Sequence, residues 1–451
     1  MINACLISIS LVLFFFFSWF SLVSIIEKEP LAFKRSLLLA IILPLPFILL
    51  FASSFQFKEL LSLILFGLIV LSIFALLIPI NFSKNTGCEN PQSQIDERNT
   101  MFSRRELTNK TEKFESYYKN NPEYLAIDND WRKKPGLMSE KSSMYSPLAF
   151  TAADASFFTI ESLRNQVTGD VNTTKKNFSN IEYTQFIKKW SKKLGAINMG
   201  VCELQKHHLY SYRGRGKEYG NKVENNHKYA IAFTVEMDKD FLATGPAGPT
   251  LMESAQQYLN SGIIAIQVAK FIRELGYEAC AHIDGDYEVV CPLVARDAGL
   301  GEIGRMGLLM TPKLGPRIRI AVVTTNLPLL INKRKPDYTV QSFCAICKKC
   351  ANVCPSQAIS KNNKIEIEGI NRWQINQEKC FSYWCTSGTD CGRCMSVCPY
   401  SHPNNLLHNM VRWGIKNSVI FRHFALFMDD FFYGRKPKPA KIPAWLNIFP
   451  K

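Results

Sequence analysis

The cysteines between residues 344 and 398 have the spacing to hold iron–sulfur clusters. The first run follows the pattern C-x2-C-x2-C-x3-C-P and consists of Cys344, Cys347, Cys350 and Cys354. The second run consists of Cys391, Cys394 and Cys398. Cubane clusters need several thiolates from one tight loop, and bacterial ferredoxins with two clusters use this spacing. Zinc sites instead use paired Cys or Cys/His ligands. The pattern therefore predicts two [4Fe–4S] clusters.

The two runs are expected to share their ligands. In two-cluster ferredoxins the fourth cysteine of each run serves the other cluster. One cluster is then bound by Cys344, Cys347, Cys350 and Cys398. The other cluster is bound by Cys354, Cys391, Cys394 and one cysteine further upstream. The upstream ligand is displaced from the regular spacing, and the candidates are Cys380 and Cys385.

Three long apolar stretches occupy residues 1–80, although the whole chain has a formal net charge of +16. They are Ala4–Ile26, Ser36–Phe57 and Leu60–Ile80. Each is long enough to cross the hydrocarbon core as a helix, and Pro44 and Pro46 are expected to kink the second. A cleaved signal peptide does not fit the first stretch, which is too long and lacks a positive n-region. Residues 1–80 are therefore predicted to form a three-helix transmembrane anchor.

Loop charge predicts the orientation of these spans. The first loop, Glu27–Arg35, carries three of the four basic residues of the anchor. The positive-inside rule places this loop in the cytoplasm. With three spans, the chain after Ile80 also lies on the cytoplasmic side. The expected location is the inner cell membrane, as a multi-pass protein.

Strand and helix patterns alternate between the membrane segment and the cysteines. The strand patterns cover Ala196–Leu204, Tyr229–Met237 and Ile318–Thr324. The helical patterns cover Thr184–Lys193 and Ser254–Leu275. This alternation indicates an α/β domain, and the composition excludes a disordered or collagen-like chain. A G-x-G-x-x-G turn after a strand and a Walker loop are both absent from the sequence, so a Rossmann nucleotide site is not supported.

Several stretches, in this order, resemble the corrinoid-dependent reductive dehalogenases. The first four are IDERNTMFSRREL (95–107), HKYAIAFTVEMD (227–238), GYEACAHIDGDY (276–287) and AGLGEIGRMGLLMTPKLGPRIRI (298–320). The others are TTNLPL (324–329), both cysteine runs, and RWGIKNSVIFRHFALFMDDFFYGRKPKP (412–439). The resemblance covers about residues 95–440.

The resemblance implies a fold class, with transmembrane helices followed by an α/β domain and a ferredoxin-like domain. The nitroreductase-like, cobalamin-binding catalytic domain would cover 81–340, and the ferredoxin-like domain with two [4Fe–4S] clusters would cover 341–403. Residues 404–451 would form a tail that packs on the catalytic domain. In this family the cobalamin is base-off, with no histidine below the cobalt. Consistently, the D-x-H-x-x-G motif is absent, because His282-Ile283-Asp284-Gly285 does not match it.

The resemblance also implies a reaction and its residues. In the family, reduced cobalt reacts at the carbon–halogen bond, halide leaves, and a proton from a tyrosine replaces it. Tyr258 matches the tyrosine, and Arg317 matches its basic partner, with Arg319 and Arg305 as rivals. A nearby cation stabilises the phenolate that proton donation leaves. Gly301, Arg305 and Gly307, in a glycine-dense turn, are candidate corrin contacts.

The sequence departs from the usual respiratory members in its N-terminal part. Those members carry a twin-arginine signal and dock on a separate three-span anchor protein, whereas here the spans precede the catalytic part. Glu27-Lys28-Glu29 is similar to the Glu-x-Glu of that anchor, which would put the first loop outside. The cytoplasmic side is favoured because no signal for exporting a folded domain is found. The fusion suggests a membrane quinol or another reduced carrier as the electron donor, beside a small organohalide substrate.

Two other functions compete with this interpretation. A non-catalytic membrane ferredoxin would hold the clusters without any corrinoid. An epoxyqueuosine reductase would pair a corrinoid with two clusters and act on tRNA, which the basic charge could favour. That enzyme needs no membrane spans, and basic charge is also common on domains that face a membrane. We therefore expect no nucleic-acid partner.

Overall fold

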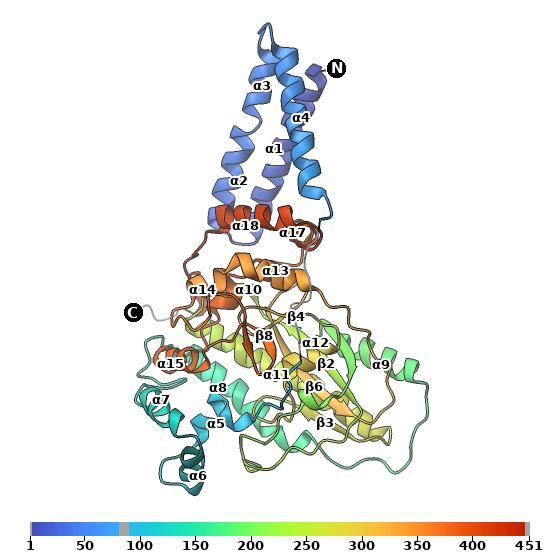
Figure 1. Cartoon of the computed structure of the whole chain (residues 1–451), viewed down its shortest axis with the longest axis vertical. Coiled ribbons are helices and arrows are strands. Elements are labelled where there is room, and N and C mark those ends of the chain that lie inside the picture. The colour runs from blue at the N-terminus through green and yellow to red at the C-terminus, as the bar shows by residue number, and fades with distance from the viewer. Residues whose placement is uncertain (1, 81–89, 447–451) are drawn as a thin grey trace. The chain divides into compact units, whose positions relative to one another are not determined.

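The computed structural model describes residues 2–80 and 90–446 (Figure 1). The chain forms two compact units. The smaller unit combines residues 1–83 with 402–437, and the larger unit combines residues 84–401 with 438–451. Each unit is described by itself.

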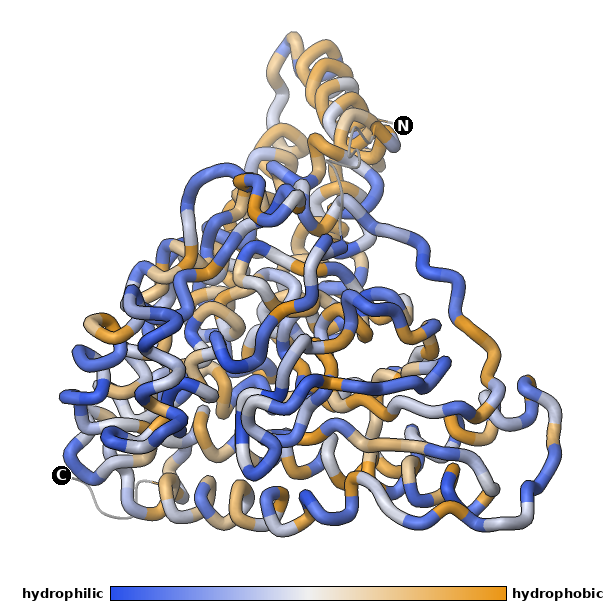
Figure 2. The backbone as a smooth tube through the Cα atoms, turned by 60° about the horizontal axis from the view of Figure 1, so that its bottom comes forward, coloured by the Kyte–Doolittle hydropathy of each residue, from blue (hydrophilic) through white to orange (hydrophobic). Residues whose placement is uncertain are grey.

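The smaller unit is built on three apolar helical spans, which confirms the predicted anchor helices. The spans are Ile2–Ile26, Pro30–Ala52 and Lys58–Leu77. Figure 2 shows hydrophobic colour along most of their length. The second span is broken, as expected, because a proline cannot donate to the helix ladder. Its halves are α2 (Pro30–Ile42) and α3 (Leu45–Ala52), beside α1 (Ile2–Ile26) and α4 (Lys58–Leu77).

Residues 402–437 depart from the expected tail, because they group with the N-terminal helices. They form α17 (Leu406–Asn417) and α18 (Val419–Tyr433). The rings of Phe20 and Phe432 lie 4.5 Å apart between centroids, and Leu407 and Phe17 join the same buried apolar cluster. Residues 438–446 instead belong to the larger unit, where the Ala440 amide donates to the Ala243 carbonyl at 2.9 Å.

The larger unit is centred on a four-stranded antiparallel sheet of order β1-β2-β6-β3. The strands are β1 (Asn198–Glu203), β2 (Tyr229–Glu236), β3 (Ala279–His282) and β6 (Ile318–Thr325). β1, β2 and β6 match the three predicted strands. Alternation of side chains between the two faces lets both faces be apolar and covered.

Two helices cover the two faces of this sheet. The long α11 (Gly248–Glu274) packs on one face through Ile264 and Val268, which share a buried core with Phe233 of β2. α11 begins six residues before the predicted start, because Pro249 suits the first turn of a helix. The shorter α12 (Cys291–Asp297) covers the other face through Val294. The sheet and α11 thus form a rigid frame.

The remaining elements of the larger unit flank this frame. Those before the sheet are α5 (Met101–Glu106), α6 (Glu112–Asn120), α7 (Pro122–Arg132), α8 (Pro147–Ser162) and α9 (Asn180–Lys193). Within and after it lie α10 (Lys239–Ala243), α13 (Tyr338–Cys347), α14 (Lys349–Val353), α15 (Gln377–Ser387) and α16 (Arg393–Ser396). Two short ribbons pair β4 (Glu302–Ile303) with β5 (Leu309–Met310) and β7 (Ile365–Ile367) with β8 (Ile370–Arg372).

Candidate functional site

The first cysteine set gathers where α13 and α14 meet. Lys348 adopts a left-handed conformation with φ 55°, which ends α13 after Cys347 and lets α14 begin at once. The thiols that act electrostatically on buried Cys398 are those of Cys344, Cys347 and Cys350. These are the four cysteines that the spacing groups together.

The second set gathers around Cys394. The thiols of Cys354, Cys380 and Cys391 are electrostatic neighbours of this buried thiol. Cys350 of the first set is also an electrostatic neighbour of it. Cys391 has φ 64° and Gly392 has φ 63°, and this turn directs the loop back toward α15. The two sets are therefore adjacent, as electron transfer between two clusters requires.

Cys385, the alternative upstream ligand, lies apart from the second set. It belongs to an apolar cluster with Met101, Trp131 and Phe381, and the charged groups that act on it are Arg105 and Lys134. Cys380 stands five residues earlier on the same helix, and its electrostatic neighbours are Cys391 and Cys354. All cysteines in the described part of the chain are free thiols. The donor set therefore fits cubane clusters better with Cys380 than with Cys385.

Residues of the glycine-dense turn lie in two different surroundings, a cavity wall and the packed contact with β5. Gly307, with φ 76°, lines a cavity of about 250 Å³ together with Gly304. Gly301 does not line it, because its Cα packs so closely on β5 that a Cβ would lie 2.2 Å from the Met310 carbonyl oxygen. Of the predicted corrin contacts in this turn, only Gly307 therefore faces a described cavity.

Arg305, the third predicted corrin contact, supports the first cysteine set instead. Its buried guanidinium donates to the carbonyls of Cys344 at 3.0 Å, Ser360 at 2.7 Å and Asn362 at 2.9 Å. It also lies over the Trp373 ring, 4.4 Å from the centroid. Its donors are thus used in fixing the backbone around the cysteines.

Tyr258 lines two cavities of the larger unit. One has a volume of about 500 Å³ and is lined by aromatic residues, including Phe102, Phe157 and Trp384, and by charged residues. The other has a volume of about 200 Å³ and contains Tyr287. Burial raises the pKa of the Tyr258 phenol, and the nearby Arg319 opposes this rise. The phenol therefore keeps its proton at neutral pH.

Arg319 is the basic residue that accompanies Tyr258. Its guanidinium carbon lies 4.7 Å from the Tyr258 ring centroid, and Arg319 lines the same two cavities. Asp390 forms an ion pair with it at 3.2 Å, and Ser254 bonds both Arg319 and Asp390. Because Asp390 directly precedes Cys391, this pair joins the cavity wall to the second cysteine set.

Arg317, the predicted partner of Tyr258, lies elsewhere. It precedes β6, in the turn after Pro316, and is almost fully buried. Its guanidinium donates to the Ser401 carbonyl at 3.0 Å, the Glu236 carboxylate at 2.7 Å and the Met237 carbonyl at 2.5 Å. These bonds fix the chain after the last cysteine to the sheet. The rival residue Arg319, and not Arg317, is the arginine whose guanidinium lies over the Tyr258 ring.

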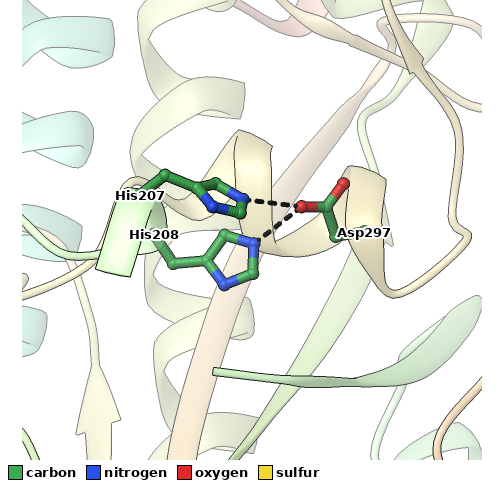
Figure 3. Close-up of side chains that lie close together, drawn as sticks. All are labelled: His207, His208 and Asp297. Atoms are coloured by element: carbon green, nitrogen blue, oxygen red, sulfur yellow. Dashed lines mark hydrogen bonds and ion pairs between the residues drawn. The ribbon is translucent and has the colours of Figure 1, made fainter. Parts of the chain in front are cut away.

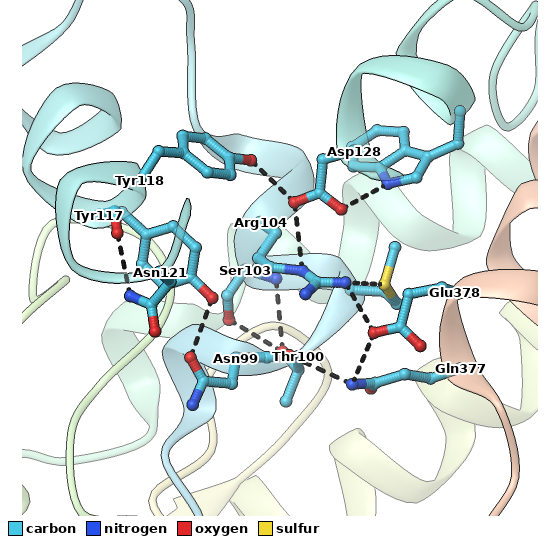
Figure 4. A network of polar contacts seen from close by, with 12 residues as sticks. Asn99, Thr100, Ser103, Arg104, Tyr117, Tyr118, Asn121, Asp128, Gln377 and Glu378 are labelled. Carbon is cyan, nitrogen blue, oxygen red and sulfur yellow. Dashed lines mark hydrogen bonds and ion pairs between the residues drawn. The ribbon is translucent and has the colours of Figure 1, made fainter. Parts of the chain in front are cut away.

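A buried network ties the segment 95–107 to the helix that carries Cys380 (Figure 4). Fully buried Arg104 pairs with Asp128 at 3.3 Å and with Glu378 of α15 at 3.0 Å. Asp128 also accepts from the Trp131 indole at 2.9 Å and from the Tyr118 hydroxyl at 2.8 Å. Sequence reasoning noticed this stretch only by its resemblance. The structure gives it a physical role in holding α15.

His207, His208 and Asp297 form a compact cluster that a metal could use (Figure 3). Both Nε2 atoms bond the Asp297 carboxylate, at 2.9 and 2.8 Å. However, Nδ1 of His208 accepts from the Gln205 amide at 3.0 Å, so the proton of the neutral ring belongs on Nε2. Burial lowers the pKa of His208, which favours that neutral ring. The cluster is best explained as a hydrogen-bonded clamp on α12.

The fold and the cysteine sets define an iron–sulfur α/β protein with a cavity of aromatic and charged residues beside its second set. The family model for a 4Fe-4S dicluster domain matches residues 343–402. The chain is 30% identical over 298 residues to the tetrachloroethene reductive dehalogenase of Sulfurospirillum multivorans, covering 58% of this chain and 59% of that relative.

Solved structures agree with this match. The catabolic reductive dehalogenase NpRdhA aligns with a TM-score of 0.62 at 23% identity, over 79% of this chain and 50% of that one. A second reductive dehalogenase, described for B12-dependent dehalogenation, aligns with a TM-score of 0.58 at 25% identity, over 69% and 47%. The chain is thus a homologue of the reductive dehalogenases with their fold. It spans about half to three-fifths of the length of these proteins.

Proposed function

We propose that this protein is a membrane-anchored reductive dehalogenase, which replaces a halogen of a small organohalide by hydrogen. The reaction consumes two electrons and one proton and releases one halide ion. The observation that carries the proposal is the Tyr258–Arg319 pair, which lines the wall of the 500 Å³ cavity next to the second cysteine set. The aromatic part of the lining suits the apolar body of a halogenated substrate, and the charged part suits polar groups on it.

Tyr258 is proposed as the proton donor. A phenol with a raised pKa holds its proton until negative charge develops beside it. Arg319 then stabilises the phenolate, since its guanidinium lies over the same ring. Asp390 and Ser254 hold the guanidinium in place. The pair would therefore deliver the proton at the part of the cavity wall that lies next to a proposed cluster ligand.

The cofactors proposed are two [4Fe–4S] clusters and base-off cobalamin. Cys380 completes the second ligand set in this proposal. Bound cobalamin would supply the two-electron reducing chemistry at its cobalt. One observation is in keeping with the base-off form. Among the described residues, those that line the cavities around Tyr258 and Gly307 do not include a histidine.

Metal content tests this function against the non-catalytic ferredoxin. The full chain is purified without oxygen, in detergent, from cells supplied with cobalamin. We expect about eight iron atoms and about one cobalt per chain. Such a preparation should release halide from organohalides with a reduced dye as donor. Eight iron atoms without cobalt, and no halide release, would leave the ferredoxin as the function.

A membrane quinol is proposed as the electron donor. Oxidising a quinol releases two protons with the two electrons, so a donor site needs nearby bases. The smaller unit buries two His–carboxylate pairs next to the spans. His408 Nε2 lies 3.0 Å from Glu27, and His402 Nε2 lies 2.9 Å from Asp429. The two imidazole rings stack with centroids 4.6 Å apart.

The quinol proposal can be tested separately from the dehalogenase proposal, because the electron donor of the assay can be changed. Glu27→Gln should slow halide release driven by a quinol in proteoliposomes and leave release driven by a soluble dye unchanged. Glu59→Gln is the matched control, because Glu59 is the acidic residue in the first turn of α4. Equal rates for Glu27→Gln and the control with quinol would contradict the donor site.

The catalytic unit is proposed to lie on the cytoplasmic side of the membrane. Lys28, Lys34 and Arg35 in the first loop and the start of α2 support this orientation. A reporter enzyme active only in the periplasm, fused between α3 and α4, should be active. Inactivity there, with activity of the same reporter at the C-terminus, would reverse the orientation.

A further inference from the structure

Helix α17 is amphipathic with its apolar side outward. Leu406, Met410 and Trp413 follow the spacing of one helix face and are 67%, 54% and 57% exposed. The opposite side buries His408 and Arg412 beside Leu407 and Ile415. A helix that packs on a core in water normally keeps its large apolar side chains inward and its charged side chains outward. The exposed apolar face of α17 departs from that pattern.

Helix α18 has a similar exposed apolar face, and its buried side carries Ala425 and Phe432 beside two charged residues. Ile420, Phe424 and Phe427 share one face and are 45%, 39% and 66% exposed. Its buried side carries Arg422, which donates to the Ile415 carbonyl at 2.7 Å, and Asp429, which bonds His402. The two helices thus present six large apolar side chains outward. An area of this kind marks an interaction surface.

We propose that α17 and α18 lie in the membrane interface, with these six apolar side chains inserted among the lipid acyl chains. The first reason is continuity with the spans. The Val419 amide at the start of α18 donates to the Ile80 carbonyl, just beyond α4, at 3.0 Å. His408 of α17 bonds Glu27, directly after α1. Both helices therefore begin where the chain leaves the hydrocarbon.

The second reason is charge. Residues 402–437 contain five Lys or Arg against two Asp, and three of the five, Lys416, Arg435 and Lys436, are not buried. Lys416 and His423 stand exposed on these helices beside the apolar face. Anionic lipid headgroups attract basic residues at this depth, and tryptophan is enriched at the same level. Lipid therefore fits the composition of the face as well as its place.

Fluorescence quenching by brominated lipids tests this placement directly. The full chain is placed in nanodiscs whose lipids carry bromine either near the headgroup end or near the terminal methyl end of the acyl chain. The difference in emission between the wild-type chain and Trp413→Phe isolates Trp413. Trp190→Phe is the matched control, because Trp190 packs on the core of the larger unit.

The expected result is strong quenching of the Trp413 emission by the shallow bromine and weaker quenching by the deep bromine. The Trp190 emission should respond to neither. Absence of quenching at Trp413 would overturn the proposal and point to a second protein or a second copy as the cover. Stronger quenching by the deep bromine would also overturn it, because the helix would then insert. The readout needs no dehalogenase activity, so it stands apart from the proposed function.

Discussion

The two units of this chain bury opposite kinds of side chain. The larger unit has an apolar core of Phe233, Ile264 and their neighbours and places its polar pairs on the walls of cavities. The smaller unit exposes apolar residues along its helices and buries polar pairs such as Glu27 with His408. The difference fits the proposed membrane anchor, because helices that face lipid expose apolar side chains and must pair their polar groups internally.

The largest expected effect concerns a polar group on a cavity wall. Tyr258→Phe removes the proposed proton donor and leaves the ring in place. The rate of halide release should fall by about 10²- to 10⁴-fold, as general acid catalysis contributes. Iron and cobalt content should match the wild-type values. Tyr277→Phe, at a tyrosine that does not line the described cavities, is the control, and equal activity of both variants would remove Tyr258 from the mechanism.

The same substitution in each unit then tests the comparison itself. Phe233→Ala in the larger unit should lower the free energy of unfolding by about 3–5 kcal/mol, because it empties a buried site. Phe427→Ala on α18 should change it by less than about 1 kcal/mol in detergent, because this ring is 66% exposed. Thermal unfolding of the full chain measures both. A large loss at Phe427 would mean that protein, not lipid, covers it.

Arg317 and Arg319 sharpen the comparison within the larger unit. Arg317→Met leaves buried carbonyls without donors and should cost about 1–3 kcal/mol of stability. Where folded, it should keep its dehalogenase activity per cobalt. Arg319→Lys keeps a positive charge beside Asp390 and should keep the better stability, but it removes the planar guanidinium over Tyr258 and should lower activity. If the two variants exchange these outcomes, the cavity does not contain the site.

The smallest effect is a dependence of stability on pH. Burial lowers the pKa of His282 to about 3, below the value of the unfolded chain near 6.5. Below about pH 6.5 the unfolded state therefore binds a proton at His282 that the folded state does not bind. The contribution of His282 to the free energy of unfolding is constant above about pH 6.5. It should fall with acidification, by at most about 1.4 kcal/mol per pH unit. Replacing His282 by Asn should flatten this slope in denaturant titrations, whereas exposed His423→Asn should not.

Local patterns predicted the frame of the larger unit. β2 and β6 could be predicted because buried strands are rich in β-branched residues. α11 could be predicted because its apolar spacing continues over many turns. The cysteine sets were readable because ligand spacing is a local property. The spans were readable from length and hydropathy alone.

Other features depend on contacts that the sequence does not express. Arg317 and Arg319 look equivalent in sequence, and only the turn after Pro316 separates their roles. The helices α17 and α18 have an amphipathic pattern that fits a water-facing helix and an inverted one equally well. Only the burial of Arg412 and Arg422 decides between them. Cys380 and Cys385 were likewise separated by their surroundings, not by spacing.

Helix α15 joins two tasks within one turn. Cys380 belongs to the second cysteine set, and Trp384, four residues later, lines the 500 Å³ cavity. Four residues of helix span about 6 Å. Under the proposed function, a change at Trp384 that admits a larger halide is expected to alter the surroundings of the adjacent cluster as well. Substrate range and reduction potential would then change together at this helix.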